Sequence, residues 1–265
     1  MIHASNDERN IRATTRERIA RIEIHRPDKK NAFTGEMYAQ LGDALAAAAG
    51  DREARVVLLH GTPECFTAGN DIADFLKPPP TGEEAPIWKL FRALPSMPKP
   101  VVAAVAGPAI GIGSTMLLHC DLVYAGESAR FQLPFVPLGI TPEFGSTFLL
   151  PRIAGYQRAA ELLFLGQPFT AHKAKEVGIV NEVVPDAEVL ARAEKAAAQL
   201  AALPPVSLRL TKELLKSAQG AAVQERIAEE TRIFTERLSS PEAKEAMSAF
   251  LEKRKPDFSR FKRYP

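Results

Sequence analysis

The first regular pattern in the chain is an alternation of apolar and polar residues from Ile19 to Ile24. In an extended chain this spacing separates the residues onto two faces, with Ala20, Ile22 and Ile24 on one and Arg21 and Glu23 on the other. A period of two is typical of a strand with one buried face. We therefore predict a half-exposed strand here.

A helical period follows the first strand. Met37, Leu41 and Leu45 share one face at helical spacing. Thr34 can cap the start of this helix, and Gly50 can end it. The apolar run 55–60 comes next and predicts a buried strand.

The same alternation of strand and helix then recurs with variation. Strand-like runs cover 99–106 and 122–124, and helix-like runs cover 111–118, 146–153 and 159–165. Repeated strand–turn–helix units predict a layered α/β core. We assign residues 1–203 to this core.

The character of the chain changes after Pro185. Long helical stretches occupy 187–203, 207–218, 221–238 and 241–255, with almost no β-branched runs. We expect a helical C-terminal region over 204–265, appended to the core. Between the two halves of the core, Lys77–Pro86 is rich in Pro and Gly, so we expect an exposed loop that borders the site.

The composition is that of an ordinary globular protein and gives no indication of nucleic-acid binding. The chain has 265 residues, 46% hydrophobic and 25% charged, which is enough for one large domain or a domain with an appendage. A net charge of +2 does not predict nucleic-acid binding, although Lys253–Lys255 and Arg260–Arg263 concentrate positive charge near the end. We expect no nucleic-acid partner.

Cysteine content and hydropathy bear on the compartment. Cys65 and Cys120 are far apart and form neither a disulfide framework nor a metal-ligand cluster. The N-terminus carries Asp7 and Glu8 without an apolar signal segment, and no run approaches the roughly 18 apolar residues of a membrane helix. We expect a cytoplasmic protein with no metal and no membrane partner.

Three segments carry candidate chemistry. Glu143 lies in a loop bracketed by Pro and Gly, between an apolar run and an apolar helix. The segments Phe66–Asp71 and Gly107–Gly113 each follow a strand and can present backbone N–H groups to an anion. Taken alone, Phe66–Asp71 is equally compatible with an ordinary tight turn, and Gly107–Gly113 fits better a glycine-rich turn that allows close helix–strand packing. Together the three predict a base facing an oxyanion hole, which suits proton removal beside a thioester carbonyl.

The chain resembles the crotonase (enoyl-CoA hydratase/isomerase) superfamily over nearly its whole length. The matching runs are Arg26–Ala32, Phe66–Asp71, Lys99–Pro108, Cys120–Asp121, Phe131 with Pro134, Leu138–Gly139 and Phe250–Lys255. The resemblance implies an α/β spiral of ββα units and a C-terminal helical region that forms a homotrimer or a dimer of trimers. It also implies an acyl-CoA thioester as substrate, so that CoA enters with the substrate and no separate cofactor is expected.

The resemblance also assigns site residues by position. It makes the backbone N–H groups of Thr67 and Ile112 the oxyanion donors. The residues expected to line the substrate site are Lys29, Phe66, Ala68, Gly69, Asn70, Asp71, Gly111, Met116 and Phe135. Among them, Met116 and Phe135 are expected to keep water out, whereas Lys29 is a candidate contact for CoA phosphates.

Two departures from the hydratase pattern point to a different reaction. Hydratases of this superfamily use two glutamates, and Thr115 and Phe135 occupy those positions here. The run 138–147 instead resembles the peroxisomal type of Δ3,Δ2-enoyl-CoA isomerase, which implies that Glu143 is the single catalytic glutamate. We therefore predict a one-base isomerase. The alternatives are a hydratase, an acyl-CoA hydrolase or dehalogenase that uses Glu143, and a non-catalytic acyl-CoA or RNA-binding protein.

Overall fold

The computed structural model describes residues 10–75 and 85–261. At the centre lies a six-stranded sheet with strand order β1-β2-β3-β4-β6-β9. Its strands are β1 (Ile11–Arg16), β2 (Ile19–Ile24), β3 (Val56–His60), β4 (Val101–Val105), β6 (Leu122–Gly126) and β9 (Glu182–Val184). The first two pair antiparallel and all later neighbours pair parallel. The loop predicted for Lys77–Pro86 lies almost entirely outside the described residues.

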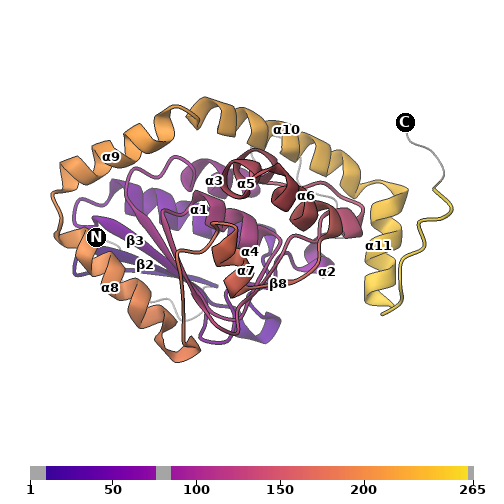
Figure 1. Ribbon diagram of the computed structural model, residues 1–265, viewed down its shortest axis with the longest axis horizontal. Helices are drawn as coiled ribbons and strands as arrows, with labels where there is room; N and C mark the ends of the chain where they lie inside the picture. Colours follow the sequence, from indigo (N-terminus) through magenta and orange to yellow (C-terminus); the bar gives the residue numbers. More distant parts are fainter. Residues whose placement is uncertain (1–9, 76–84, 262–265) are drawn as a thin grey trace.

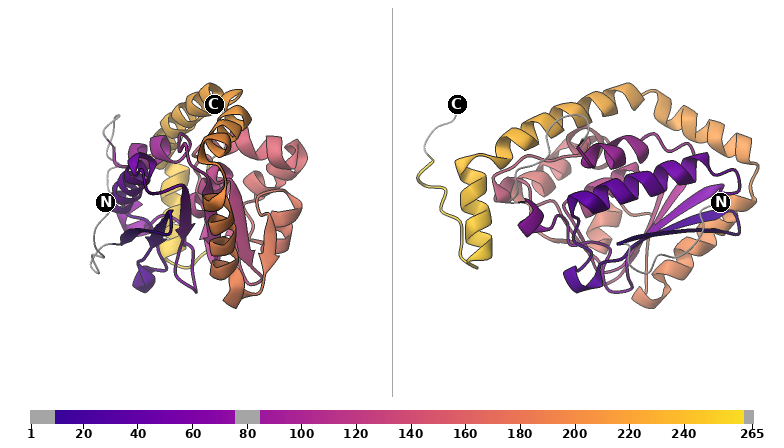
Figure 2. Two further views of the ribbon diagram at one scale, coloured as in Figure 1. Left: turned by 90° about the vertical axis from the view of Figure 1, so that its left-hand side faces the viewer. Right: turned by 180° about the vertical axis from the view of Figure 1, so that it is seen from behind.

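Helices cover both faces of this sheet. Helix α8 (Val189–Ala202) lies in front of the sheet in Figure 1, and α1 (Gly35–Gly50) lies in front of it in the reversed view of Figure 2. Alternate residues of β3 therefore enter different cores: Val57 and Leu59 pack with α1, and Val56 and Leu58 pack with α8. A strand buried on both sides needs an uninterrupted apolar run, which explains the sequence of β3.

The predicted start of α1 is confirmed. Thr34 has an extended backbone, and its hydroxyl accepts a hydrogen bond from Met37 N at 3.3 Å. This bond satisfies one of the N–H groups that the first helical turn leaves free. The helix presents Met37, Leu41 and Leu45 to the core, all fully buried.

A second, three-stranded sheet was not predicted. It joins β5 (Pro108–Ile110), β7 (Arg130–Gln132) and β8 (Phe169–Thr170). The segment 107–113 thus forms a strand before it turns into a helix. That helix is shorter than predicted, because α4 (Ile112–Thr115) passes into the 3-10 helix η2 (Met116–His119).

The other helices connect and cover these strands. They are η1 (Pro27–Lys29), α2 (Ile72–Phe75), α3 (Ile87–Ala93), η3 (Val136–Leu138), α5 (Ser146–Ala154), α6 (Tyr156–Leu165), α7 (Ala171–Glu176) and η4 (Asp186–Glu188). Together with the sheets they confirm the predicted α/β class. In the part of the chain that the structure describes, no helix is long and apolar enough to cross a membrane.

The C-terminal helices form an arch over the core. Helices α9 (Pro205–Ser217) and α10 (Gly220–Leu238) run above α3, α5 and α6, and α11 (Pro241–Leu251) turns back beyond them (Figure 1). The arch is anchored by the buried Lys212, whose Nζ lies 2.7 Å from Asp121 Oδ2 and 2.6 Å from the Lys99 carbonyl oxygen. A buried ammonium with these partners fixes α9 against the core.

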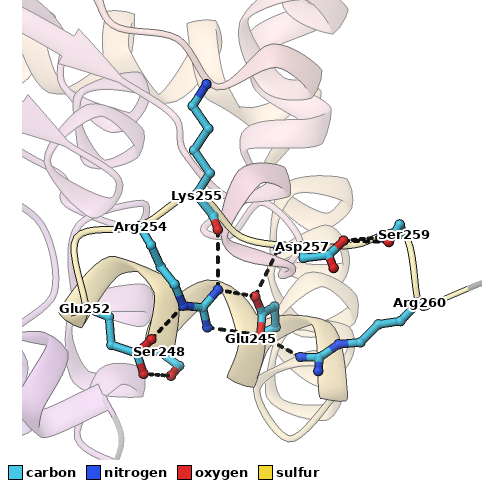
Figure 3. Close-up of polar contacts among 8 residues, drawn as sticks. All are labelled: Glu245, Ser248, Glu252, Arg254, Lys255, Asp257, Ser259 and Arg260. Atoms are coloured by element: carbon cyan, nitrogen blue, oxygen red, sulfur yellow. Dashed lines mark hydrogen bonds and ion pairs between the residues drawn. The ribbon is translucent and has the colours of Figure 1, made fainter.

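The last helix ends four residues earlier than predicted. Arg254 N donates to the Ala249 carbonyl, and Lys253 adopts a left-handed backbone with φ of 52°, which closes the helix at Leu251. The following tail is held by Glu245 of α11, which binds Arg254, Arg260 and the backbone N–H of Asp257 (Figure 3). The Arg254 hydrogen bond, followed by that of Asp257 N–H, lowers the pKa of Glu245 to about 2.

Candidate active site

In the segment Phe66–Asp71, which follows β3, one backbone N–H has no acceptor among the described residues. The N–H groups of Phe66, Thr67, Ala68, Gly69 and Asp71 all donate to acceptors within the described residues. Thr67 N, in particular, lies 2.9 Å from the Pro108 carbonyl oxygen. The prediction that the Thr67 N–H is an oxyanion donor is therefore wrong, because that group is already bonded in the sheet-like pairing of the two loops.

The free donor in this loop is the N–H of Asn70. Phe33 bonds to the flanking residues, since its N–H donates to the Gly69 carbonyl and its carbonyl accepts from Asp71 N–H. In such a parallel bridge the middle residue, Asn70, directs its own N–H to the opposite side. No acceptor within the described chain binds it.

The second donor lies opposite the first. Thr67 and Ala109 form a parallel bridge, so the two segments run side by side in the same direction. Three residues further along each segment lie Asn70 and Ile112. Ile112 is the first residue of α4, where an N–H has no partner inside the helix, and no described acceptor binds it. This register brings two unpaired N–H groups to the same end of the paired segments, as an oxyanion hole requires.

The glycines of these segments allow the close approach. Gly69 has a φ of 91°, and a Cβ at this position would lie 3.0 Å from the Ile110 carbonyl oxygen. Gly111 has a φ of 56°, which starts the turn from β5 into α4. Both positions favour glycine because other residues rarely adopt these angles.

The segment that contains Arg26 and Asn31 stabilises the donor loop through hydrogen bonds. The buried Asn31, itself left-handed with φ of 56°, donates from Nδ2 to the carbonyl oxygens of Cys65 (2.7 Å) and Phe66 (3.2 Å). Arg26 pairs with Asp71 at 2.8 Å, and this hydrogen bond lowers the pKa of the Asp71 carboxyl. Asp71 thus holds the loop in place. Lys29, predicted to meet CoA phosphates, is exposed on η1.

Glu143 is the central feature of the site. It lies between η3 and α5 and is 1% exposed, and neither of its carboxyl oxygens has a hydrogen-bond partner among the described residues. The buried hydroxyl oxygens of Thr141 and Ser146 are also without partners. Buried polar groups are normally paired, so this cluster is suited to meet polar atoms of a bound molecule. Burial, followed by the charge of Glu230, raises the pKa of Glu143 to about 8.

The residue after Glu143 holds the turn in an unusual conformation. Phe144 has a φ of 59°, which is rare for a bulky side chain. Its ring stacks on Phe91 with centroids 4.1 Å apart, and its carbonyl oxygen lies 2.8 Å from His119 Nε2. Burial lowers the pKa of His119 to about 3, so the ring is neutral and its Nε2–H donates to that carbonyl. His119 is therefore a support for the turn, as expected for a core residue.

Tyr38 of α1 connects the base with the donor loop. Its hydroxyl donates to Asn70 Oδ1 at 2.6 Å. Burial and then the charge of Glu143 raise the pKa of this phenol. The sequence patterns did not single out Tyr38, since its position on α1 is that of an ordinary core residue.

Three of the predicted site residues, Phe66, Met116 and Phe135, are buried in the main hydrophobic core, which also contains Ile112 and Phe144. The hydroxyl of the buried Thr115 makes only a long hydrogen bond of 3.4 Å, to the Ile112 carbonyl, among the described residues. Neither Thr115 nor Phe135 carries a group that can exchange a proton near neutral pH. Among the described residues, Glu143 is thus the carboxylate at the site that can exchange a proton. Glu230 binds the turn that carries it.

Sequence reasoning also missed Glu230. It lies on α10, is 4% exposed, and binds the turn that carries Glu143. The sequence did carry a signal for this residue, because Glu230 occupies a position in the helical period where an apolar residue is expected. The buried residues of this helix are Val223, Ile227, Glu230 and Phe234. A glutamate at a stripe position predicts a buried carboxylate with specific partners.

Comparison with known proteins identifies relatives along almost the full chain. The model of the enoyl-CoA hydratase/isomerase family matches residues 14–261. The 2,3-dehydroadipyl-CoA hydratase of Escherichia coli is 35% identical, over 91% of this chain and 95% of that protein. Human enoyl-CoA delta isomerase 2 is 34% identical over 91% of this chain, which corresponds to 63% of the human protein.

A solved structure shares the fold. An enoyl-CoA hydratase/isomerase from Pseudoalteromonas atlantica T6c superposes with a TM-score of 0.91 and 40% identity, covering 94% of this chain and all of that one. Relatives named for hydration and for isomerisation are about equally similar. The overall similarity therefore does not distinguish the two reactions.

Proposed function

The chain belongs to the enoyl-CoA hydratase/isomerase family, and we propose that within this family it is an isomerase that converts 3-enoyl-CoA into 2-trans-enoyl-CoA. The observation that carries this proposal is Glu143, a buried carboxylate whose two oxygens have no partner. One base is sufficient to move a proton from C2 to C4. A hydratase, in contrast, would need a pair of carboxylates to activate a water molecule. Thr115 and Phe135 occupy the two positions where those carboxylates are expected.

In the proposed mechanism the thioester oxygen accepts hydrogen bonds from the N–H groups of Asn70 and Ile112. Glu143 removes a proton from C2, and the negative charge moves onto the thioester oxygen as a dienolate. The two N–H groups stabilise that charge where it develops. Glu143, now protonated, returns the proton to C4, which leaves the double bond between C2 and C3. No other proton donor is needed.

The surroundings of Glu143 support this use. Glu143 is 1% exposed and the predicted site residues Met116 and Phe135 are buried, so water that could trap the dienolate or attack the product has little access. The same burial raises the pKa of Glu143 to about 8, where a carboxyl exchanges protons readily near physiological pH. The base and its environment thus fit a proton shuttle.

The test compares two substrates and two proteins. Wild type and Glu143→Gln are incubated with 3-trans-hexenoyl-CoA and, separately, with crotonyl-CoA, while conjugated-enoyl absorbance is followed. We expect conversion of the first substrate only, and its loss in the variant. Hydration of crotonyl-CoA that persists in Glu143→Gln would contradict the proposal. Release of free CoA or halide would instead indicate a hydrolase or dehalogenase.

The exposed face of α9 supports the expected self-association. Val206, Leu210, Leu214 and Leu215 are between 44% and 77% exposed in the single chain. A contiguous apolar surface of this kind is typical of an interface. We propose that it takes part in a homotrimer or a dimer of trimers, as the family resemblance implies.

A further inference from the structure

Glu230 binds the turn of the base from a distant part of the chain. One carboxyl oxygen accepts from Gly145 N at 2.6 Å, and the other accepts from Thr147 N at 2.9 Å and from the Thr147 hydroxyl. Gly145 is two residues after Glu143, whereas Glu230 is 85 positions from Gly145. The turn is therefore fixed by α10 as well as by its own backbone.

The two buried carboxylates have opposite surroundings. Glu230 has three donors, whereas Glu143 has none. Hydrogen bonds from N–H and O–H groups favour an ionised carboxylate, and their absence in a buried site favours the protonated form. When two such groups lie close together, one proton is shared between them unequally. Burial raises the pKa of both carboxyls, but hydrogen bonds from Thr147 and Gly145 oppose that rise at Glu230, so Glu230 ionises before Glu143.

On this basis we infer that Glu230 is a positioning residue, which fixes the Glu143–Thr147 turn and, through its own charge, sets the pH range over which Glu143 becomes ionised and can act as a base. Only the expected effect of Glu230 on the reaction rate rests on the proposed function. The positioning role requires that the negative charge of Glu230 acts on Glu143 in the folded protein. It assigns α10 a role in the chemistry in addition to its role in packing.

Other charged groups near this pair do not replace Glu230. Arg226, on the same helix, favours the ionised form of Glu230 and pairs with Glu229 at 2.9 Å. From α1, the neutral Tyr38 interacts with Glu143, and from η2 the neutral His119 binds the turn through the Phe144 carbonyl. The nearby charge that raises the pKa of Glu143 is that of Glu230, after the larger effect of burial.

The decisive variant is Glu230→Gln, which keeps the shape and removes the charge. Infrared difference spectra follow the protonated carboxyl band of Glu143, assigned by its loss in Glu143→Gln, across pH 5 to 10. We expect the titration midpoint of this band to move to lower pH in Glu230→Gln. The ascending limb of kcat/KM should move in the same direction. Glu229→Gln, which removes an exposed charge from the same helix, should leave both midpoints in place.

A second variant tests the fixing of the turn without removing the charge. Thr147→Val deletes one donor to Glu230, so we expect faster amide hydrogen exchange at Gly145 and a several-fold lower kcat with little change in KM. This variant carries the test if Glu230→Gln does not fold. Unchanged exchange and unchanged kcat in Thr147→Val would overturn the inference.

The outcomes separate this inference from the proposed function. If the band midpoint moves in Glu230→Gln while wild type does not isomerise 3-enoyl-CoA, the positioning role stands and the proposed reaction fails. If wild type isomerises but the midpoint of Glu143 is the same in Glu230→Gln and wild type, the positioning role is refuted. A merely structural glutamate would lower kcat without moving either midpoint.

Discussion

Tyr38 donates a hydrogen bond of 2.6 Å to Asn70 Oδ1, and this bond joins helix α1 to the residue whose backbone N–H is free. The phenol also interacts electrostatically with Glu143. One buried side chain therefore connects the proposed base with one of the two proposed oxyanion donors. The alignment of these groups depends on the packing of α1 against the sheet.

Removal of the Tyr38 hydroxyl should misalign the donor loop. In Tyr38→Phe, Asn70 loses this partner, and a lost hydrogen bond of about 1 kcal/mol corresponds to roughly a fivefold loss of kcat. KM should change little, because the CoA contacts are not altered. Steady-state kinetics with 3-trans-hexenoyl-CoA measure this, with the exposed Tyr156→Phe as the control. Equal kcat in both variants would exclude a role for the hydroxyl.

The pH profile should report the ionisation of Glu143. A base must be ionised to accept a proton, and the pKa of Glu143 is raised to about 8. We therefore expect kcat/KM to rise about tenfold per pH unit below that value and to level off above it. Initial rates between pH 5.5 and 9.5 test this. A profile that is flat from pH 6 to 9 would contradict the assignment of Glu143 as the base.

The same ionisation should appear in protein stability. The folded pKa of Glu143 is raised from 4.5 to about 8, so the folded state binds this proton more tightly than the unfolded state. The resulting stability is complete below pH 4.5 and is lost as the pH rises through about 8. Relative to Glu143→Gln, wild type should lose at most about 1.4 kcal/mol per pH unit in this window.

Urea unfolding at several pH values measures that difference. Glu161→Gln, which replaces an exposed glutamate on α6, is the matched control and should follow wild type at every pH. A constant difference between wild type and Glu143→Gln from pH 5 to 9 would show that the two states bind the proton equally.

Thr115 should be dispensable for the proposed reaction. Its hydroxyl makes only the 3.4 Å bond to the Ile112 carbonyl, and the one-base mechanism gives it no proton to transfer. Thr115→Val removes this hydroxyl and leaves Glu143 in place, so we expect kcat within about twofold of wild type. A loss of a hundredfold or more would mean that this position takes part in the chemistry.

The apolar face of α9 should control self-association. Leu214 is 77% exposed in the single chain, and Leu214→Glu places a charge in the proposed interface. We expect light scattering to find trimers or hexamers for wild type and smaller species for this variant. Lys195→Glu, at an exposed position of α8, should keep the wild-type assembly. A wild-type monomer would refute this part of the proposal.

The sequence was sufficient where structure is determined locally. The period of β2, the Thr34 cap of α1 and the apolar run of β3 all depend on neighbouring residues, and all three predictions are confirmed. The short strands β5 and β7 were missed. They contain three residues each and form because distant segments pair, which no local pattern records.

The site was predicted only in part for the same physical reason. Glu143 and the two glycine-containing segments were singled out from the sequence, but the free N–H was expected at Thr67, whereas the structure leaves that of Asn70 without an acceptor among the described residues. Which N–H is free depends on the partner that each one finds, and Thr67 finds Pro108 from another strand. Glu230 was overlooked because a glutamate in a helix is usually exposed, whereas here the turn supplies its donors.

The contact between α10 and the turn also matters for recombination among relatives. Residues 10–75 and 85–203 supply the base, while Glu230 comes from the arch that follows them. In a chimera that joins this core to the C-terminal helices of a homologue, the base would come from one parent. The residue at position 230, whose charge affects the pKa of that base, would come from the other. The optimum pH of such a hybrid would then be a trait of the helix donor, although every atom that touches the substrate's reacting carbons came from the core.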